Sequence, residues 1–142
     1  MLIEKPFKIA LIDDEPDQLD LYNRALKKVS DIKPLSFTDP NEALREIESQ
    51  KIRGVITDIN MPGCYGDDVL RACNRFTLGV QVYIVTGADS MLLADRCLNL
   101  GARSVIMKPV DLKKIREVGE QLKTHFETWN RVIQEVAARR VG

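Results

Sequence analysis

Acidic, hydroxyl and ammonium side chains follow four short apolar runs in this chain of 142 residues. They are Asp13 and Asp14 after residues 8–12, Asp58 after 54–57, Thr86 after 81–85, and Lys108 after 103–107. Three carboxylates held close together repel one another, and a hard divalent cation such as Mg2+, which prefers oxygen ligands, relieves that conflict. A lysine and a hydroxyl beside them can hold phosphoryl oxygens, so the set suits phosphoryl transfer to a carboxylate.

These groups can meet only if the apolar runs are neighbouring strands of one sheet. The runs at residues 8–12, 54–57 and 81–85 are nearly continuous, which is typical of strands buried on both faces of a parallel sheet. Residues 33–37 and 103–107 complete five runs, with amphipathic stretches between them. This alternation predicts an α/β fold, a doubly wound (βα)5 sandwich whose ligands bind at the carboxyl ends of the strands.

Several helix boundaries carry specific signals. Asp39 followed by Pro40 predicts a helix start with Asp39 as the N-cap. The fourth helix is expected to begin at Asp89 or Ser90 and to end at Gly101. The apolar face of the first helix is expected to consist of Leu19, Tyr22, Leu26 and Val29.

The last helix is longer than the sheet requires. Asp111 can cap it, and apolar positions recur at intervals of three or four for ~28 residues, or ~42 Å. We therefore divide the chain into a domain at residues 1–122 and a helical extension at residues 123–142. The extension carries an apolar stripe, which predicts a partner: a second copy, a following domain or the chain's own domain. The stripe consists of Phe126, Trp129, Ile133 and Val136.

Composition excludes several other classes of protein. Lys and Arg number 21, and Asp and Glu also number 21, so the formal net charge is zero. This balance argues against a nucleic-acid binder that acts through bulk basic charge. No apolar run approaches the ~20 residues of a membrane span, and the N-terminus lacks the apolar core of a signal peptide. We expect a cytoplasmic protein without direct nucleic-acid or membrane contact.

The order of these motifs resembles the receiver domain of two-component response regulators over roughly residues 6–122. The resemblance rests on Asp13-Asp14, Asp58 with Met61-Pro62-Gly63 and Gly66, Thr86-Gly87, and Lys108-Pro109, each at a strand end. It implies a flavodoxin-like sandwich with strand order 2-1-3-4-5. It also implies that a histidine kinase phosphorylates Asp58 with Mg2+, which switches an interaction with a downstream effector protein or domain.

The resemblance further implies a role for each residue at the strand ends. The metal ligands would be Asp13, Asp14, Asp58 and the backbone carbonyl of Asn60, with Asp14 a direct ligand. The phosphoryl group on Asp58 would contact Thr86, Gly87, Ala88 and Lys108. Thr86 and Lys108 would assist Asp58 in catalysing its own phosphorylation and dephosphorylation, without the turnover of a conventional enzyme. Pro109 would follow a cis peptide bond.

One position departs from the family's pattern and leaves alternatives open. The family usually has Tyr or Phe where this chain has Val105, and that aromatic ring moves together with the residue at Thr86 as a switch. Val cannot swing in this way. An interaction or dimerisation module that ignores phosphorylation therefore stays open. A phosphatase with an aspartate nucleophile is a further alternative. That class of phosphatase has the motif Asp-x-Asp after its first strand, where this chain has Asp13-Asp14-Glu15.

Overall fold

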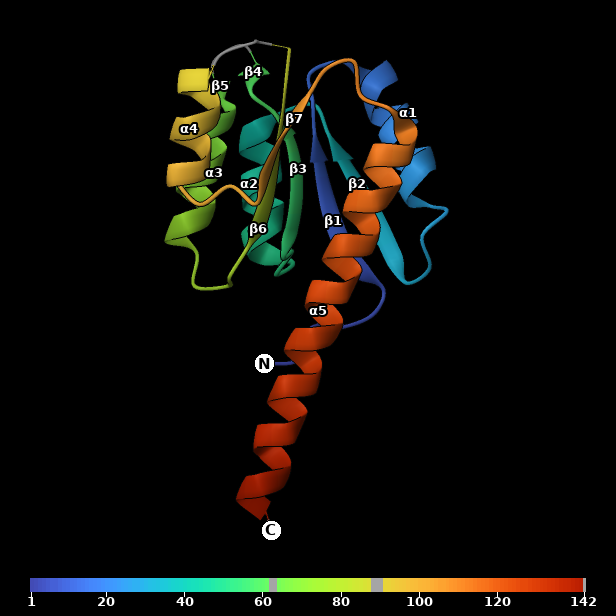
Figure 1. Cartoon of the computed structure of the whole chain (residues 1–142), viewed down its shortest axis with the longest axis vertical. Coiled ribbons are helices and arrows are strands. Elements are labelled where there is room, and N and C mark those ends of the chain that lie inside the picture. Colours follow the sequence, from blue (N-terminus) through green and yellow to red (C-terminus); the bar gives the residue numbers. More distant parts are fainter. Residues whose placement is uncertain (62–63, 88–90, 142) are drawn as a thin grey trace.

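Five parallel strands form the central sheet in the order β2-β1-β3-β6-β7 (Figure 1). The computed structural model of the chain describes residues 1–61, 64–87 and 91–141. The strands of the sheet are β1 (Phe7–Ile12), β2 (Ile32–Phe37), β3 (Gly54–Asp58), β6 (Gln81–Thr86) and β7 (Ser104–Met107). The short strands β4 (Asn60–Met61) and β5 (Cys64–Tyr65) pair only with each other. Counting the strands of the main sheet alone, the predicted order 2-1-3-4-5 is confirmed.

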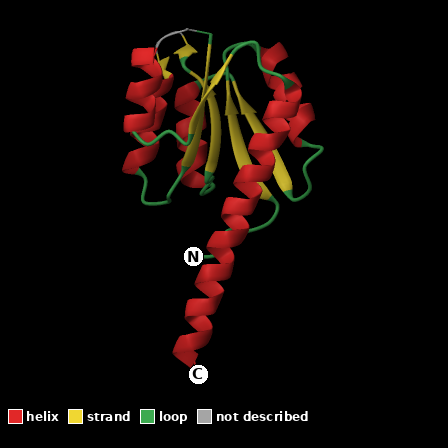
Figure 2. Ribbon diagram, in the orientation of Figure 1, coloured by secondary structure: helices red, strands yellow, loops and turns green. Residues whose placement is uncertain are grey.

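Helices cover both faces of the sheet (Figure 2). They are α1 (Pro16–Leu26), α2 (Pro40–Ser49), α3 (Gly66–Arg75), α4 (Met91–Asn99) and α5 (Leu112–Val141). One buried cluster joins the sheet to α1 and α5, and the other joins it to α2, α3 and α4. Because successive strand residues point to opposite faces, a strand between two such clusters must be apolar at nearly every position. The predicted doubly wound sandwich is confirmed.

In the described residues, the predicted capping residues lie at the ends of their helices. Asp39 Oδ1 accepts a hydrogen bond from the Asn41 N–H at 2.9 Å, and Pro40 opens α2. Asp111 Oδ1 accepts from the Lys113 N–H at 2.9 Å at the start of α5. After the end of α4, Gly101 has a φ of 97°, in the left-handed region that favours glycine. The predicted start of α4 at residues 89–90 lies outside the described residues.

Phe126 belongs to the core of the domain, so of the three partners left open for the stripe, this residue packs against the chain's own domain. The side chain is 1% exposed, and its ring centroid lies 5.3 Å from that of Phe7 on β1. A Cβ at Gly54, which opens β3, would lie only 3.2 Å from Phe126 Cζ. The absence of a side chain at Gly54 therefore lets α5 pack this ring against the base of the sheet.

Trp129 and Asn130 continue the contacts of α5 with its own chain. Trp129 Nε1 donates to the Met1 carbonyl at 3.0 Å, and the Arg53 guanidinium lies 5.0 Å from the Trp129 ring centroid. The Asn130 side chain accepts from the Ile3 N–H at 2.7 Å and donates to the Ile3 carbonyl at 2.9 Å. The N-terminal segment therefore fastens α5 to the domain, and Trp129 is occupied by contacts within the chain.

Beyond Asn130, α5 runs past the end of the sheet (Figure 1). Val132 and Val136 are 46% and 50% exposed, and Ile133 is half-buried. Only Ile133 and Val136 of the predicted stripe therefore remain for a partner. Although α5 has 30 residues, the described helices include none with both the length and the apolar character of a membrane span.

Alanine substitutions at the first and last residues of the predicted stripe should have unequal effects on the free energy of unfolding. Phe126→Ala removes a buried ring and should lower the free energy of unfolding by about 3–5 kcal/mol. Val136→Ala changes an exposed position and should alter it by about 0.5 kcal/mol or less. Urea unfolding of both variants measures the difference, and equal costs would contradict the placement of Phe126 in the core.

Candidate functional site

The acidic cluster forms because β1 and β3 are neighbouring parallel strands. Ile12 pairs with Thr57 in their register, so the next residues along, Asp13 and Asp58, emerge side by side. Asp14 follows directly. One carboxylate oxygen from each of Asp13, Asp14 and Asp58 can be chosen so that all three lie within 4.8 Å of one another. Asp13 and Asp58 are buried and Asp14 is exposed, so negative charge is concentrated at the mouth of the sheet.

Lys108 and Thr86 complete the set from the next two strand ends. Lys108 Nζ lies 3.4 Å from Asp58 Oδ1, in an ion pair whose acidic partner is buried. Thr86 is buried and follows Val85, the residue that pairs with Asp58 in the register of β3 and β6. The Lys108 N–H donates to the Thr86 carbonyl at 2.8 Å, which ties the loop after β7 to the end of β6. The fold thus brings the predicted acidic, hydroxyl and ammonium groups to one edge.

Within the cluster, the carboxyl group of Asp13 has a raised pKa. Burial raises the pKa of its carboxyl from 3.8 to about 6, and the nearby charges of Asp58 and Asp14 act in the same direction. The Glu15 N–H, which donates to Asp13 Oδ1 at 2.9 Å, and the Lys108 ammonium oppose this rise in pKa. The other oxygen, Oδ2, is buried with no hydrogen-bond partner. This carboxylate has a free acceptor and an excess of negative neighbours.

The donor set fits a divalent cation bound by oxygen ligands. Mg2+ is held in proteins by one or two carboxylates together with water and phosphate oxygens. The unpartnered Oδ2 of Asp13 and the three converging carboxylates supply such ligands, while Lys108 balances only part of their charge. Mg2+ at this edge would therefore ligate an otherwise unsatisfied buried oxygen and offset the repulsion among the three acids.

The remaining predicted positions lie around this cluster. Asn60 is exposed at the start of β4, immediately beyond the end of β3, and its role as a carbonyl ligand stays a prediction. A Cβ at Gly87 would meet only Lys108 Cδ, at 3.9 Å, so its neighbours do not require a glycine there. Val105 is half-buried against the cluster of α2, α3 and α4. Ala88 lies outside the described residues, and the bond before Pro109 is cis as predicted.

One residue near the site was not predicted to have a polar role. Tyr22 was interpreted only as part of the apolar face of the first helix, and its side chain is indeed buried in the cluster of α1 and α5. Its hydroxyl, however, is buried without a hydrogen-bond partner. Burial and the charges of Asp13, Asp58 and Glu15 raise the pKa of this hydroxyl to about 12. Periodicity identified the buried position but gave no information about the hydroxyl.

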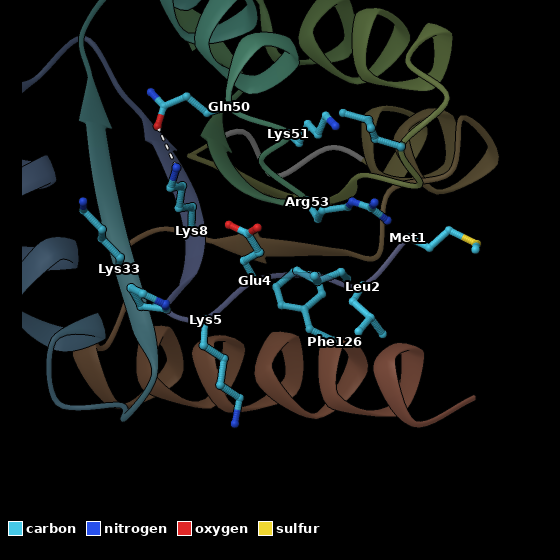
Figure 3. A pocket seen from close by; sticks show the side chains of 13 residues that line it. Met1, Leu2, Glu4, Lys5, Lys8, Lys33, Gln50, Lys51, Arg53 and Phe126 are labelled. Atoms are coloured by element: carbon cyan, nitrogen blue, oxygen red, sulfur yellow. Dashed lines mark hydrogen bonds between the residues drawn. The ribbon is translucent and has the colours of Figure 1, made fainter. Parts of the chain in front are cut away.

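A separate cavity of about 480 Å³ lies at the opposite edge of the sheet, among the starts of the strands (Figure 3). Its wall includes Phe126, and Lys8 Nζ donates to Gln50 Oε1 there at 3.1 Å. In Figure 3, the side chains of Lys5 and Lys33 point in different directions and do not converge on one point. The convergent chemistry of the described residues is therefore at the acidic edge.

Replacing Asp13 should change how stability depends on pH when a chelator is present. Because the pKa of Asp13 in the folded chain is about 6, above its ordinary 3.8, the folded state binds this proton more tightly than the unfolded state. The stabilising contribution is complete below about pH 3.8 and is lost as the pH rises through about 6. Relative to wild type, Asp13→Asn should therefore gain stability between pH 4 and pH 7. Urea unfolding across this range in EDTA measures the difference, and a constant difference would contradict the raised pKa.

Comparison with known proteins identifies the family. A model of the response regulator receiver domain matches residues 9–120. The phosphoglycerate transport system transcriptional regulatory protein PgtA of Salmonella typhimurium is 31% identical over 107 residues, which cover 75% of this chain but 26% of that protein. The probable chemotaxis protein CheY of Rhizobium etli is 28% identical over 118 residues, which cover 82% of this chain and 92% of that protein. The match therefore spans about a quarter of the length of PgtA but nearly the whole length of the CheY protein.

A solved structure agrees with this assignment. The response regulator receiver domain protein from Clostridium thermocellum superposes with a TM-score of 0.78 at 27% identity, covering 86% of this chain and 98% of that one. The family match covers most of the chain, and the strand order is that expected of such a domain. The chain belongs to the response regulator receiver domain family of two-component signalling.

Proposed function

We propose that Asp58 accepts a phosphoryl group from a histidine kinase in the presence of Mg2+, and that this changes the affinity of the chain for an effector protein or domain. The observation that carries the proposal is the cluster of Asp13, Asp14 and Asp58 with Lys108 Nζ 3.4 Å from Asp58 Oδ1. The cluster lies at the carboxyl ends of the strands in a chain of the receiver domain family.

Each residue of the cluster has a separate role in the phosphoryl transfer. An oxygen of Asp58 forms a bond to phosphorus while the P–N bond of the donor's phosphohistidine breaks. Asp13 and Asp14 would hold Mg2+, with the exposed Asp14 as a direct ligand, and the Asn60 carbonyl would be a further ligand. The cation, when bound, neutralises charge on the phosphoryl oxygens. Lys108 then moves its ion pair from the Asp58 carboxylate to a phosphoryl oxygen, and the Thr86 hydroxyl donates to another.

This chemistry differs from turnover by a conventional enzyme. The acceptor is a side chain of the protein, so each transfer occupies one chain until the aspartyl phosphate is hydrolysed. The reaction is self-catalysed because Asp58, Lys108 and the cation ligands all come from this chain. The product is a charged group at the edge of the sheet, where the loops after β3, β6 and β7 meet, and this edge is the origin of the switch.

A second candidate function is an interaction module that dimerises through α5 irrespective of phosphorylation. Two observations favour it. Val105 lies half-buried against the core where the family usually has a switching aromatic residue. The end of α5 extends into solvent and carries Ile133 and Val136, and a short helical segment gains most of its stability from packing. A second copy of the same helix would cover both side chains.

Phosphorylation of Asp58 can be tested with a small acyl phosphate. Acetyl phosphate and Mg2+ should add one phosphoryl group to wild type, detected by intact mass, and EDTA should prevent the addition. Asp58→Asn should abolish it because the acceptor oxygen is lost. Asp20→Asn, an exposed acid on α1, is the matched control and should be phosphorylated normally. Persistence of the product in Asp58→Asn would contradict the assignment of the acceptor.

The two candidate functions differ in their response to a phosphoryl mimic. Under the first candidate, Mg2+ and beryllofluoride should change amide hydrogen exchange near Thr86 and over residues 105–140 in wild type. Asp58→Asn should show no such change. A dimer whose stability is insensitive to beryllofluoride in wild type but is lost in Val136→Glu would favour the second candidate over the first.

A further inference from the structure

Two buried side-chain oxygens of the described residues have no hydrogen-bond partner, and the two are complementary. They are Oδ2 of Asp13, which can only accept when the carboxyl is ionised, and the hydroxyl of Tyr22, which has a proton to donate. Phenylalanine would fill the same space at position 22 without burying an unpaired hydroxyl. The presence of tyrosine therefore points to a use for that hydroxyl.

The fold directs both groups toward the same place. Phe7, Ile9 and Leu11 on β1 belong to the cluster of α1 and α5, so by the alternation of a strand Asp13 continues on the face that α1 covers. The start of α1 is tied to this acid, since the Glu15 N–H donates to Asp13 Oδ1. Tyr22 lies on the buried face of the same helix.

Tyr22 can reach the acidic edge from two turns along α1. Side chains on a helix lean toward its N-terminus, and the N-terminus of α1 is at this edge. The charges of Asp13, Asp58 and Glu15 all act on the ionisation of the Tyr22 hydroxyl, which places it within electrostatic range of the cluster. A tyrosine hydroxyl is protonated at neutral pH, and it is therefore a donor.

We infer that Tyr22 is a positioning residue for the cation site: its hydroxyl donates a hydrogen bond to one water that bridges it to the carboxylate of Asp13, and this bridge fixes the orientation in which Asp13 helps to bind Mg2+. This inference rests on the proposed Mg2+ site. Outer partners of this kind orient ligand side chains, and their loss typically weakens metal affinity about 10–100-fold. Tyr22 adds this effect without adding a charge to an already acidic edge.

The chain offers a matched control at Tyr83. This second buried tyrosine lies on β6 and donates its hydroxyl proton to Gln121 Oε1 on α5 at 3.0 Å. Tyr83→Phe and Tyr22→Phe each remove one hydroxyl from a tyrosine of the same core cluster. The charges of Asp13 and Asp58 act on Tyr22, whereas the charge that acts on Tyr83 is that of Arg103, so only the replacement of Tyr22 should alter cation binding.

The test is calorimetric titration of the full chain with Mg2+ at neutral pH, together with urea unfolding in EDTA. Tyr22→Phe should weaken Mg2+ binding about tenfold or more while leaving stability in EDTA equal to or above that of wild type. Tyr83→Phe should keep the Mg2+ affinity within about twofold of wild type. At saturating Mg2+, Tyr22→Phe should still be phosphorylated by acetyl phosphate, because Asp58 is intact.

The outcomes separate this inference from the proposed function. Mg2+ affinity within twofold of wild type in Tyr22→Phe would overturn the role of Tyr22 and leave the phosphoacceptor proposal standing. If Tyr22→Phe lowers the free energy of unfolding in EDTA but leaves the Mg2+ affinity unchanged, the hydroxyl stabilises only the core. That result would also overturn the inference. Failure of wild type to bind Mg2+ would overturn both.

Discussion

Three carboxylates converge at one edge of the sheet, and the chain holds them there against their mutual repulsion and the cost of burying two of them. The register of β1 and β3 makes the convergence unavoidable, because the residues after Ile12 and Thr57 must emerge side by side. Lys108 offsets part of the charge, and Asp13 keeps one buried oxygen without a partner. The site is therefore electrostatically unfavourable by itself, and under our proposal a bound cation would relieve this cost.

The rest of the structure offsets the energetic cost of the converging carboxylates. Two apolar clusters on opposite faces hold the strands in register, so the polar residues need to contribute little to stability. The same strand ends also lead into the neighbouring elements. Asp13 Oδ1 accepts from the Glu15 N–H at the start of α1, and the Lys108 N–H donates to the Thr86 carbonyl. A change of charge at Asp58 therefore acts on backbone that is already tied to the cluster.

Much of this arrangement could be predicted from local patterns. Continuous apolar runs identified the buried strands, and the residues directly after them identified Asp13, Asp58 and Thr86 as neighbours. The partner of Phe126 could not be chosen from the sequence, for a physical reason. Periodicity shows which face of a helix is apolar, but it does not show where the domain beneath that face ends. That end depends on contacts distant in sequence, such as Asn130 with Ile3.

Tyr22 shows the same limitation at the level of single atoms. Its spacing with Leu19 and Leu26 predicted burial, and the side chain is buried. Whether its hydroxyl has a partner depends on the position of β1 and on the charge of Asp13, which no local pattern contains. The hairpin of β4 and β5 was missed because strands of two residues are too short to show an alternation.

Proton release on Mg2+ binding tests the central claim most directly, because the claim is that a cation relieves the strain on a buried carboxylate. Burial raises the pKa of Asp13 to about 6, so more of this group is protonated at pH 6 than at pH 8. Calorimetry in two buffers of different ionisation enthalpy should show proton release on Mg2+ binding at pH 6 and much less release at pH 8. Mg2+ binding without proton release at pH 6, or no binding at either pH, would contradict the account.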